Sequence, residues 1–423
     1  MPVLFLIVFG FSISLFSCQN GSQNEPDTDK ISSFQQLKKE FIEPSATYRT
    51  VPFAVWNGEV THEKIDRQLM ELKKSGVGGV FIHPRWGMIT GYLDSAWYEL
   101  VEYTVKRGEE MGLNVWLYDE NTFPSGFAGG HVAEQMPDAY QHGQVLVEVK
   151  QNILTPDINT TYTRILMKDR TDDSFVDISE QVSDFEGKPG EYYLYENKAY
   201  FPSARYGGYS YVDLIYPGVT EKFIEVTMPG YEQTVGEYFG NSVPGIFTDE
   251  PNIKPPSGDG IRYTPDLFEQ FEQRWGYKLE ENLPSLFNEI GNWRRVRHNY
   301  YQTLLQLFID RWAKPWYNYT EEHNLKWTGH YWEHGWPNPQ HGGDNMAMYA
   351  WHQVPGIDML FNTQEERPDQ FGNVRAVKEL ISVANQMGYQ RTLSETYGAA
   401  GWEIRFEDLK RLGDWQHTLG VTL

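Results

Sequence analysis

The chain runs through PFAVWN (residues 52–57), VGGVFI (77–82) and LNVWLY (113–118) in succession, and each of these apolar runs has the length of a buried strand. Apolar residues recur at helical spacing in the two segments between them, over about 61–75 and 95–111. A strand, helix, strand, helix, strand order with short connections predicts a parallel sheet with right-handed crossovers.

The same alternation continues to the last residue. Further strands are predicted at 243–247, 325–329, 357–361, 391–394 and 420–423, and helices at 217–239, from 264, at 293–323, 374–387 and 406–414. The count of eight strands predicts an α/β fold, a (β/α)8 TIM-type barrel that the chain truncates at the eighth strand. A doubly wound sheet would carry a glycine fingerprint after its first strand, and Trp56-Asn57-Gly58-Glu59 offers none.

One segment interrupts this rhythm. Residues 144–205 contain short alternating runs (QVLVEV, TRILMK, EYYLY and KAYF) between Asp, Gly and Pro turns. The pattern predicts a small antiparallel β insertion after the third strand. We therefore expect one barrel domain over residues 46–423 with an insertion at 144–205.

The composition excludes several classes of protein. With 36 basic and 58 acidic residues the formal net charge is −22, so the chain should repel nucleic acid. Apolar residues make up 40% of the chain, which excludes general disorder. Because there is a single cysteine, an intramolecular disulfide, a Cys-rich zinc site and an iron–sulfur cluster are excluded as well.

The amino terminus resembles a bacterial lipoprotein signal. Residues 3–16 form an apolar run too short to span a bilayer, and Leu15-Phe16-Ser17-Cys18 follows. We expect a signal peptide at residues 1–18, lipidation of Cys18 and a polar tether over 19–45. The protein would then be anchored to the cell envelope through lipid rather than span a membrane. A plain signal peptide with an incidental Cys18 is the alternative.

Polar residues gather where the predicted strands end. In a parallel barrel these positions share one mouth, and active sites lie there. The candidates are Asn57, Glu59, His83, Arg85, Asp119, Glu120, Asp249, Glu250, His330, Glu333 and Glu395. Several carboxylates in one mouth raise one another's pKa values, which can keep a general acid neutral beside an ionised partner. For any single one of them, a solvated rim position is the alternative.

Two of these strand ends resemble the pattern of a large clan of barrel glycoside hydrolases. FTDEP places Glu250 after the fourth strand and SETYG places Glu395 after the seventh, where that clan carries its acid/base and its nucleophile. Asp249 stands where the clan commonly has Asn, and a carboxylate cannot donate an amide hydrogen bond to a sugar hydroxyl. The resemblance implies that Glu250 protonates the leaving oxygen and that Glu395 acts as base or nucleophile.

A wider resemblance covers nearly all of the chain from Thr50. The carrying motifs are PFAVWNGEVTHEKIDRQLMELKKSGVGGVFIHPR, WLYDENTFPSGFAGG, YVDLIYPGVTEKFIE, IFTDEP and ETYGAAGW. They resemble bacterial glycoside hydrolases related to the family 106 α-L-rhamnosidases. This implies an oligosaccharide or polysaccharide substrate and an inverting mechanism, with calcium needed in some members. It also implies a longer protein with β-sandwich domains after the barrel, so that this chain is expected to be a fragment.

The remaining polar mouth residues are assigned to sugar binding under this reading. They are His83, Arg85, Asp119, Glu120, Asp249, His330 and Glu333, with Trp332 as a stacking face. Packing at the barrel mouth is an equal alternative for Trp332. No cofactor is expected to be required, apart from the calcium that the resemblance brings in.

Two other functions compete with hydrolysis of a glycoside. The sequence HYWEH (330–334) matches the inverted zinc-peptidase motif, but that motif needs a helix, and here it follows the strand LKWTG. A non-catalytic carbohydrate-binding lipoprotein with a pseudoenzyme barrel is the other alternative.

Overall fold

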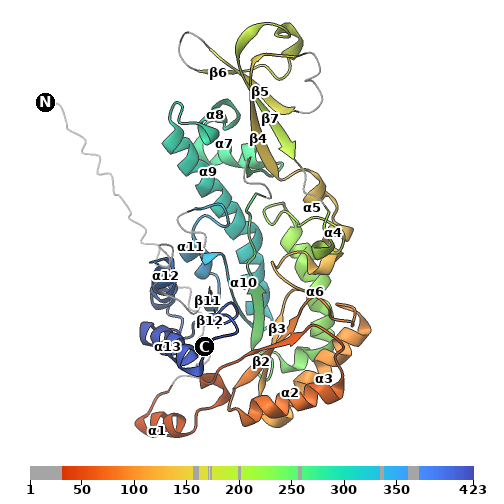
Figure 1. Cartoon of the computed structure of the whole chain (residues 1–423), viewed down its shortest axis with the longest axis vertical. Coiled ribbons are helices and arrows are strands. Elements are labelled where there is room, and N and C mark those ends of the chain that lie inside the picture. The colour runs from red at the N-terminus through yellow and green to blue at the C-terminus, as the bar shows by residue number, and fades with distance from the viewer. Residues whose placement is uncertain are drawn as a thin grey trace, which may run out of the picture.

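The structure is a computed structural model of the whole chain that describes residues 31–423 apart from 156–161, 170, 172–173, 199–201, 256–259, 334–337 and 361–370. The predicted signal peptide and Cys18 lie outside the described residues. The molecule is elongated, with a parallel sheet at one end and an antiparallel sheet at the other (Figure 1).

A seven-stranded parallel sheet forms the body of the molecule, as the apolar runs predict. Its strand order is β1-β2-β3-β8-β10-β11-β12, so strands that follow one another in this series are neighbours in space. The strands are β1 (Phe53–Trp56), β2 (Gly79–Pro84), β3 (Asn114–Tyr118), β8 (Gly245–Asp249), β10 (Lys326–His330), β11 (Val354–Met359) and β12 (Leu393–Thr396). Every neighbouring pair is parallel, and the sheet curls into an incomplete barrel.

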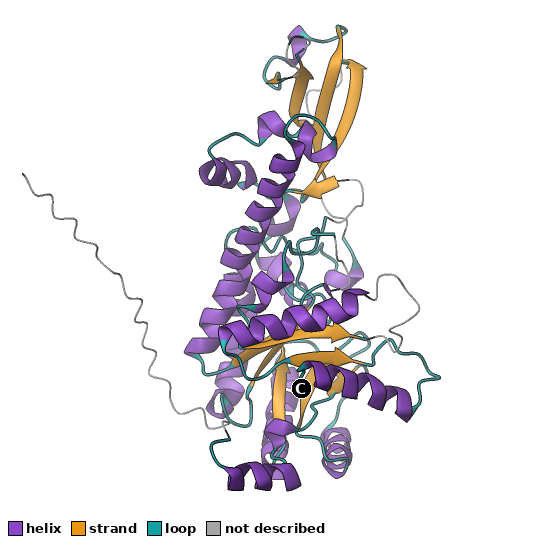
Figure 2. Cartoon of the chain, turned by 90° about the vertical axis from the view of Figure 1, so that its left-hand side faces the viewer, coloured by secondary structure: helices purple, strands orange, loops and turns teal. Residues whose placement is uncertain are grey.

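Helices connect these strands and cover the outer face of the sheet (Figure 2). Thr61 caps α2 through its side chain, and Gly112 ends α3 in the left-handed conformation. The long predicted helix over 293–323 is α9 and α10 joined by a π-helical turn at Ile309–Ala313, which ends two residues before Pro315. The connecting helices are α2 (His62–Lys74), α3 (Ser95–Met111), α6 (Val219–Val235), α9 (Trp293–Phe308), α10 (Lys314–Glu322), α12 (Phe371–Met387) and α13 (Phe406–Leu419).

Shorter helices fill the loops and the amino-terminal region. They are α1 (Phe34–Ile42), α4 (His131–Gln135), α5 (Asp138–Gln141), α7 (Leu267–Trp275), α8 (Pro284–Phe287) and α11 (Asn345–Tyr349). Helix α1 lies within the segment predicted as a polar tether, where Ser33 caps it. None of the described helices has the length and apolar character needed to cross a bilayer.

The predicted insertion supplies four strands of a five-stranded antiparallel sheet of order β6-β5-β7-β4-β9, and a later segment supplies the fifth strand, β9. Its strands are β4 (Val145–Ile153), β5 (Tyr162–Lys168), β6 (Phe175–Asp177), β7 (Pro189–Lys198) and β9 (Gly260–Arg262). EYYLY and the lysine of KAYF belong to one strand, β7, while residues 199–201 lie outside the described residues. The three-residue strands β6 and β9 were not predicted. This sheet stands beside α7–α9, away from the parallel sheet (Figure 1).

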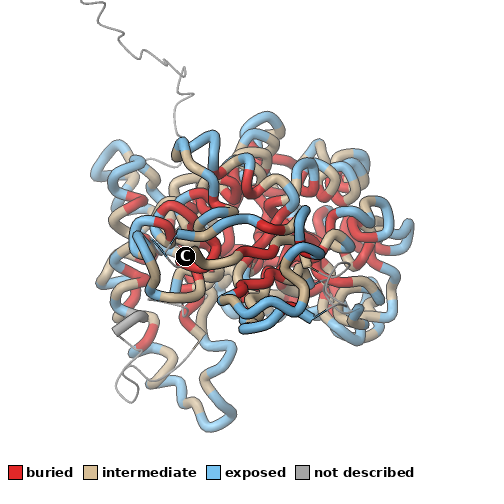
Figure 3. Tube along the Cα trace, turned by 90° about the horizontal axis from the view of Figure 1, so that it is seen from above, coloured by how far each residue is buried: buried red, intermediate tan, exposed pale blue. Residues whose placement is uncertain are grey.

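Buried side chains divide into a large core and two smaller ones. The large core lies between the parallel sheet and its helices, and buried chain runs through the middle of the molecule (Figure 3). A second core belongs to the antiparallel sheet. The third lies inside the curl, where Phe81, Trp116, Phe247 and Leu393 meet.

Residues 420–423, which were predicted as the eighth strand, do not form a separate strand of the sheet. They run beside β12, where Ser394 N donates to Leu423 O and Thr422 N donates to Thr392 O. Strands β1 and β12 are not bonded to each other, and a cavity of about 390 Å³ lies between them, lined by Val51, Phe53 and Leu393 among others.

Candidate active site

The side chains inside the curl change from apolar to polar along each strand. Alternate residues of a strand point to the same face. In β8 the inward residue Phe247 is followed two positions later by Asp249, and in β12 Leu393 is followed by Glu395. The carboxyl ends of the parallel strands therefore carry a polar cluster above an aromatic floor, at the place where we expected the mouth.

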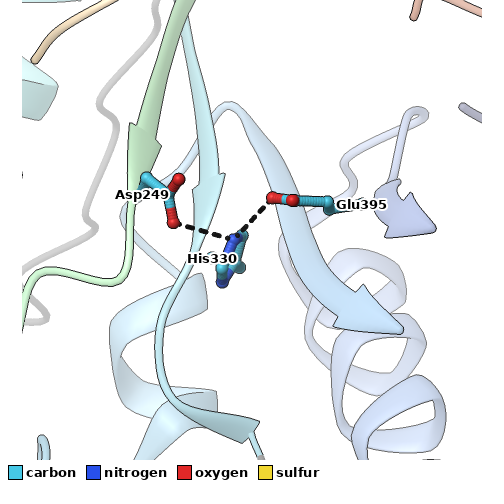
Figure 4. A group of neighbouring side chains, drawn as sticks. All are labelled: Asp249, His330 and Glu395. Atoms are coloured by element: carbon cyan, nitrogen blue, oxygen red, sulfur yellow. Dashed lines mark hydrogen bonds and ion pairs between the residues drawn. The ribbon is translucent and has the colours of Figure 1, made fainter. Parts of the chain in front are cut away.

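Asp249, His330 and Glu395 form the centre of this cluster (Figure 4). His330 Nε2 lies 3.0 Å from Glu395 Oε2 and 3.4 Å from Asp249 Oδ1. Its Nδ1 lies 3.0 Å from the carbonyl oxygen of Tyr331. A carbonyl oxygen only accepts, so Nδ1 carries a proton, and Nε2 faces two carboxylates and carries one as well. The buried ring is therefore an imidazolium.

The charges around His330 agree with this protonation state. Burial alone would lower the pKa of His330, but the hydrogen bonds that the ring donates to Asp249 and Glu395 outweigh burial and raise the pKa well above the usual value. Burial likewise opposes ionisation of Asp249, yet His330 and Tyr118 hold its pKa below the usual range. Burial raises the pKa of Glu395 to about 7, although the bond from His330 acts against it.

Glu250 directly follows β8 and enters the same cluster by a turn of the backbone. Its φ is +47°, a left-handed conformation that non-glycine residues adopt rarely. One carboxylate oxygen of Glu250 lies within 4.8 Å of a ring nitrogen of His330 and of an oxygen of Asp358. Burial and the negative charge of Asp249 raise the pKa of Glu250 to about 9. Glu250 is therefore protonated at neutral pH.

Asp358 is a member of the cluster that the sequence analysis missed. It lies in β11, is 2% exposed and pairs in register with Glu395 of β12. Its charge raises the pKa of Glu250 and that of Glu395. An acidic residue within the apolar run IDMLF was the signal that could have found it, since a buried charge in a strand needs a reason.

A hydrogen-bond network that starts at Tyr118 of the inner core and continues behind β8 fixes the position of Asp249. Tyr118 donates to Asp249 Oδ2 over 2.6 Å, and the backbone N–H of Asp249 donates to Ser125 Oγ. Ser125 in turn donates to Asp119, which also accepts from Thr248. Asp119 is fully buried in this network. It supports Asp249 from behind rather than facing the mouth, so the structure does not place it where a sugar hydroxyl could bind.

Glu120 is likewise fully buried and accepts five backbone N–H groups. Its two oxygens bind the N–H groups of Asn121, Gly126, Phe127, Ala128 and Gly129 at 2.6–3.2 Å. Burial still raises its pKa to about 7. The carboxylate holds the loop after β3 in shape, which leaves no free oxygen for the sugar contact that the sequence predicted.

His83 lies near the end of β2 and Arg85 follows the strand, but the two side chains lie in different surroundings. His83 is buried, with its ring stacked 4.2 Å from that of Tyr118, and burial together with Arg85 lowers its pKa to about 3. It is a neutral packing element beside the Asp249 network. The Arg85 guanidinium lies over the ring of Phe123 at 4.7 Å, further out in the mouth.

Glu333 and Trp332 occupy the far side of His330. Glu333 is 2% exposed and accepts from Tyr349 Oη over 2.7 Å and from the Tyr331 N–H. Its other oxygen lies 3.7 Å from His330 Nδ1. Trp332 stacks on His341 at 4.8 Å. Glu333 therefore lies on the Nδ1 side of the His330 ring, and the Trp332 ring is already stacked on the His341 ring.

The carboxylates around His330 could suggest a metal centre, but the donor set does not fit one. Calcium takes six to eight oxygen ligands, and the two candidate groups among the described residues each include the His330 nitrogen. Each of these groups brings only two carboxylates beside that nitrogen, far fewer oxygen ligands than calcium takes. In the described part of HYWEH, His330 ends β10, Tyr331 and Trp332 have no regular structure and Glu333 begins a 3₁₀ turn, so these residues do not form the α-helix that the motif needs.

Known proteins offer an independent comparison. The model of glycoside hydrolase family 106, described as α-L-rhamnosidase, matches residues 202–422, just over half of the chain. The solved structure of the rhamnosidase from Novosphingobium sp. PP1Y is similar with a TM-score of 0.65 and 14% identity, over 93% of this chain and 56% of that one. The chain thus spans little more than half of that protein's length.

Other comparisons add little. The isomaltulose synthase from Klebsiella sp. LX3 reaches a TM-score of 0.33 and 11% identity, over 82% of this chain and 56% of that one. Such a score is too low to indicate a shared fold. No curated protein matches the chain.

Proposed function

The chain belongs to glycoside hydrolase family 106, the α-L-rhamnosidases, and from that premise we propose that it hydrolyses an α-L-rhamnosyl bond in a complex oligosaccharide or polysaccharide. One observation carries the proposal beyond the family. Two glutamates from different strands, Glu250 and Glu395, lie against the same buried imidazolium with pKa values of about 9 and about 7.

The two pKa values assign the roles of the pair. Glu250 is protonated at neutral pH and would give its proton to the glycosidic oxygen as the bond to the anomeric carbon breaks. Glu395 is ionised above pH 7 and would take a proton from the water that attacks that carbon from the opposite face. His330 and Asp249 orient the pair. Inversion, which the family resemblance implies, is the outcome we propose; if Glu395 attacks directly, configuration is retained.

The curled sheet is, in this proposal, a (β/α)8 barrel. Its seven strands follow in sequential order, and residues 420–423 lie beside β12 in the position of an eighth strand. Leu423 packs into the inner core that also contacts Phe53 of β1. Support also comes from the likeness to the solved rhamnosidase.

The amino-terminal signal motif supports a location for this activity. We propose that Cys18 carries a lipid that anchors the protein in the cell envelope, with the polar substrate reached from there. Incorporation of a labelled fatty acid that is abolished by Cys18→Ala tests this point. Unchanged labelling of that variant would exclude it.

Hydrolysis of an aryl α-L-rhamnoside tests the proposed function directly. We expect Glu250→Gln and Glu395→Gln each to reduce kcat/KM by about 10²–10⁴-fold, because each substitution keeps the volume and removes a titrating group. The control is Glu407→Gln, an exposed carboxylate on α13, which should leave the rate unchanged.

A binding measurement, read together with the hydrolysis assay, separates the proposed enzyme from a non-catalytic carbohydrate-binding protein. Titration of the unmodified protein with rhamnose by calorimetry shows whether sugar binds even where no turnover occurs. Binding without hydrolysis would identify a carbohydrate-binding protein. Hydrolysis that survives both glutamine substitutions would contradict the assignment of the pair.

A further inference from the structure

A second hollow adjoins the proposed mouth on the side of β2 and β3. Its volume is about 480 Å³, within the range of small-molecule sites. Arg85, Trp86 and Ile89 line it from the loop after β2, and Asn121 and Arg205 line it from the other side. None of the proposed catalytic residues belongs to it, so its ligand would be a part of the substrate other than the sugar that is cleaved off.

Two guanidinium groups give this hollow its electrostatic character. Arg85 and Arg205 both lie over the ring of Phe123, at 4.7 and 4.5 Å from its centroid. Arg205 uses Nε and Nη2 to donate to the carbonyl oxygen of Phe123. Among the described residues neither arginine forms an ion pair with a carboxylate. The hollow therefore carries two positive charges in a chain whose net charge is −22.

The acidic residue that precedes Asn121 of the lining does not form an ion pair with them. Glu120 precedes Asn121 directly, but its oxygens are taken by the five backbone N–H groups of the same loop. The Glu120 oxygens thus bind backbone N–H groups instead of pairing with the two arginines. Planar guanidinium groups bind carboxylates with two parallel hydrogen bonds, so the hollow offers what a carboxylate ligand needs.

An apolar surface lies beside the two cations. Trp86 is 60% exposed and Ile89 is 75% exposed, although both belong to the lining of the hollow. An exposed tryptophan ring offers a flat face to the C–H side of a pyranose. A sugar ring and a carboxylate can therefore be held together, and a uronate combines the two.

We propose that this hollow is a subsite for an anionic sugar, a uronate, that lies next to the rhamnosyl unit in the substrate. The proposal rests on the proposed function for the identity of its neighbour, but not for the binding itself. The carboxylate binds Arg85 and the free edge of Arg205, and the ring lies against Trp86. The protein then selects rhamnosides attached to acidic sugars over those attached to neutral ones.

A pair of matched disaccharides tests this selectivity. We expect kcat/KM for α-L-rhamnosyl-(1→4)-D-glucuronate to exceed that for α-L-rhamnosyl-(1→4)-D-glucose by about tenfold, the gain of a charge-assisted hydrogen bond. Arg85→Gln should bring the ratio to about one, and Arg85→Lys should keep part of it. Arg294→Gln is the control, because Arg294 also lies over an aromatic ring, that of Trp293, but at an exposed position elsewhere.

A binding measurement separates this proposal from the proposed function. Calorimetric titration with free D-glucuronate and D-glucose needs no hydrolysis. We expect glucuronate to bind more tightly, and the difference to disappear in Arg85→Gln and to shrink at high salt. Equal binding of the two sugars, no binding of either, or a difference that Arg85→Gln leaves intact would overturn the subsite whether or not rhamnosides are cleaved.

Discussion

His330 sets the ionisation of the acidic residues that surround it. As an imidazolium it keeps Asp249 ionised, and the negative charge of Asp249 then raises the pKa of the adjacent Glu250. Glu395, on the other side of the ring, keeps a pKa near 7 because the hydrogen bond from His330 limits the effect of burial. One buried cation therefore gives the two glutamates different pKa values, as the proposed acid and base require.

The activity should show a bell-shaped dependence on pH. A glutamate base with a raised pKa is inactive when protonated, so kcat/KM for an aryl α-L-rhamnoside should fall as the pH drops through about 7. A glutamate acid is inactive when ionised, so the rate should fall again as the pH rises through about 9. Replacement of His330 by Gln should move the acidic limb to higher pH. A profile whose limbs stay in place in that variant would contradict the role given to His330.

The strand ends could be predicted from the sequence, but the direction of each side chain could not. Apolar runs identify where strands stop, which is why Asp249, His330 and Glu395 were found. Whether a residue beyond a run faces the mouth depends on the register and the turn that follows. Asp119 and Glu120 come after such a run and turn into the protein, where hydroxyl groups and backbone N–H groups bind them.

At the scale of elements, the contact between β8 and β10 brings the site together. Asp249 and His330 are register partners, as are Thr248 and Gly329 one position earlier. Gly329 has a φ of +129°, and a Cβ added there would lie 1.9 Å from the Thr248 carbonyl oxygen. The chain thus needs glycine at this position for the two strands to approach each other closely.

Long apolar runs made these strands predictable, whereas β9 was missed. It has only three residues, and Gly260–Arg262 becomes a strand because β4 pairs with it, not because of its own pattern. Helix α1 was missed for a similar reason, since Phe34, Leu37 and Phe41 lie in a segment that reads as polar overall. Local sequence patterns do not record pairing with a distant strand, and they give little signal in short segments.

Gly329→Ala should therefore damage both stability and activity. Because the methyl group meets backbone rather than a flexible side chain, we expect a loss of about 2–4 kcal/mol in the free energy of unfolding. We also expect kcat/KM to fall about a hundredfold, because a 1 Å displacement of His330 changes the geometry of the pair. Urea unfolding and steady-state kinetics measure the two effects. Gly236→Ala, at a helix end with open space around it, should change neither, and an equal effect of both substitutions would refute the argument.

The whole molecule combines a body built on the parallel sheet with an outlying sheet that has its own core. Leu154, Ile165, Tyr192 and Leu194 pack together in the antiparallel sheet, apart from the core beneath the parallel strands. The two parts lie at opposite ends of the molecule (Figure 1). Strand β9 joins them, and it is held to the body by the buried ion pair of Arg262 with Asp213 and by the bond from Tyr300 Oη to the Arg262 carbonyl.

This arrangement predicts that the two cores can be perturbed separately. Ile165→Ala and Ile246→Ala remove the same atoms from fully packed positions, in β5 and β8 respectively, and each should cost about 2–5 kcal/mol locally. In Ile165→Ala we expect faster amide hydrogen exchange over β4–β7 with kcat/KM within about twofold of the original, because the anchors of β9 are untouched. Ile246 lies three residues before Asp249, so Ile246→Ala should speed exchange in β3, β8 and β10 and lower kcat/KM as well. If Ile165→Ala lowers kcat/KM as far as Ile246→Ala does, the outlying sheet supports the catalytic mouth through β9, and the separation argued from the two cores is wrong.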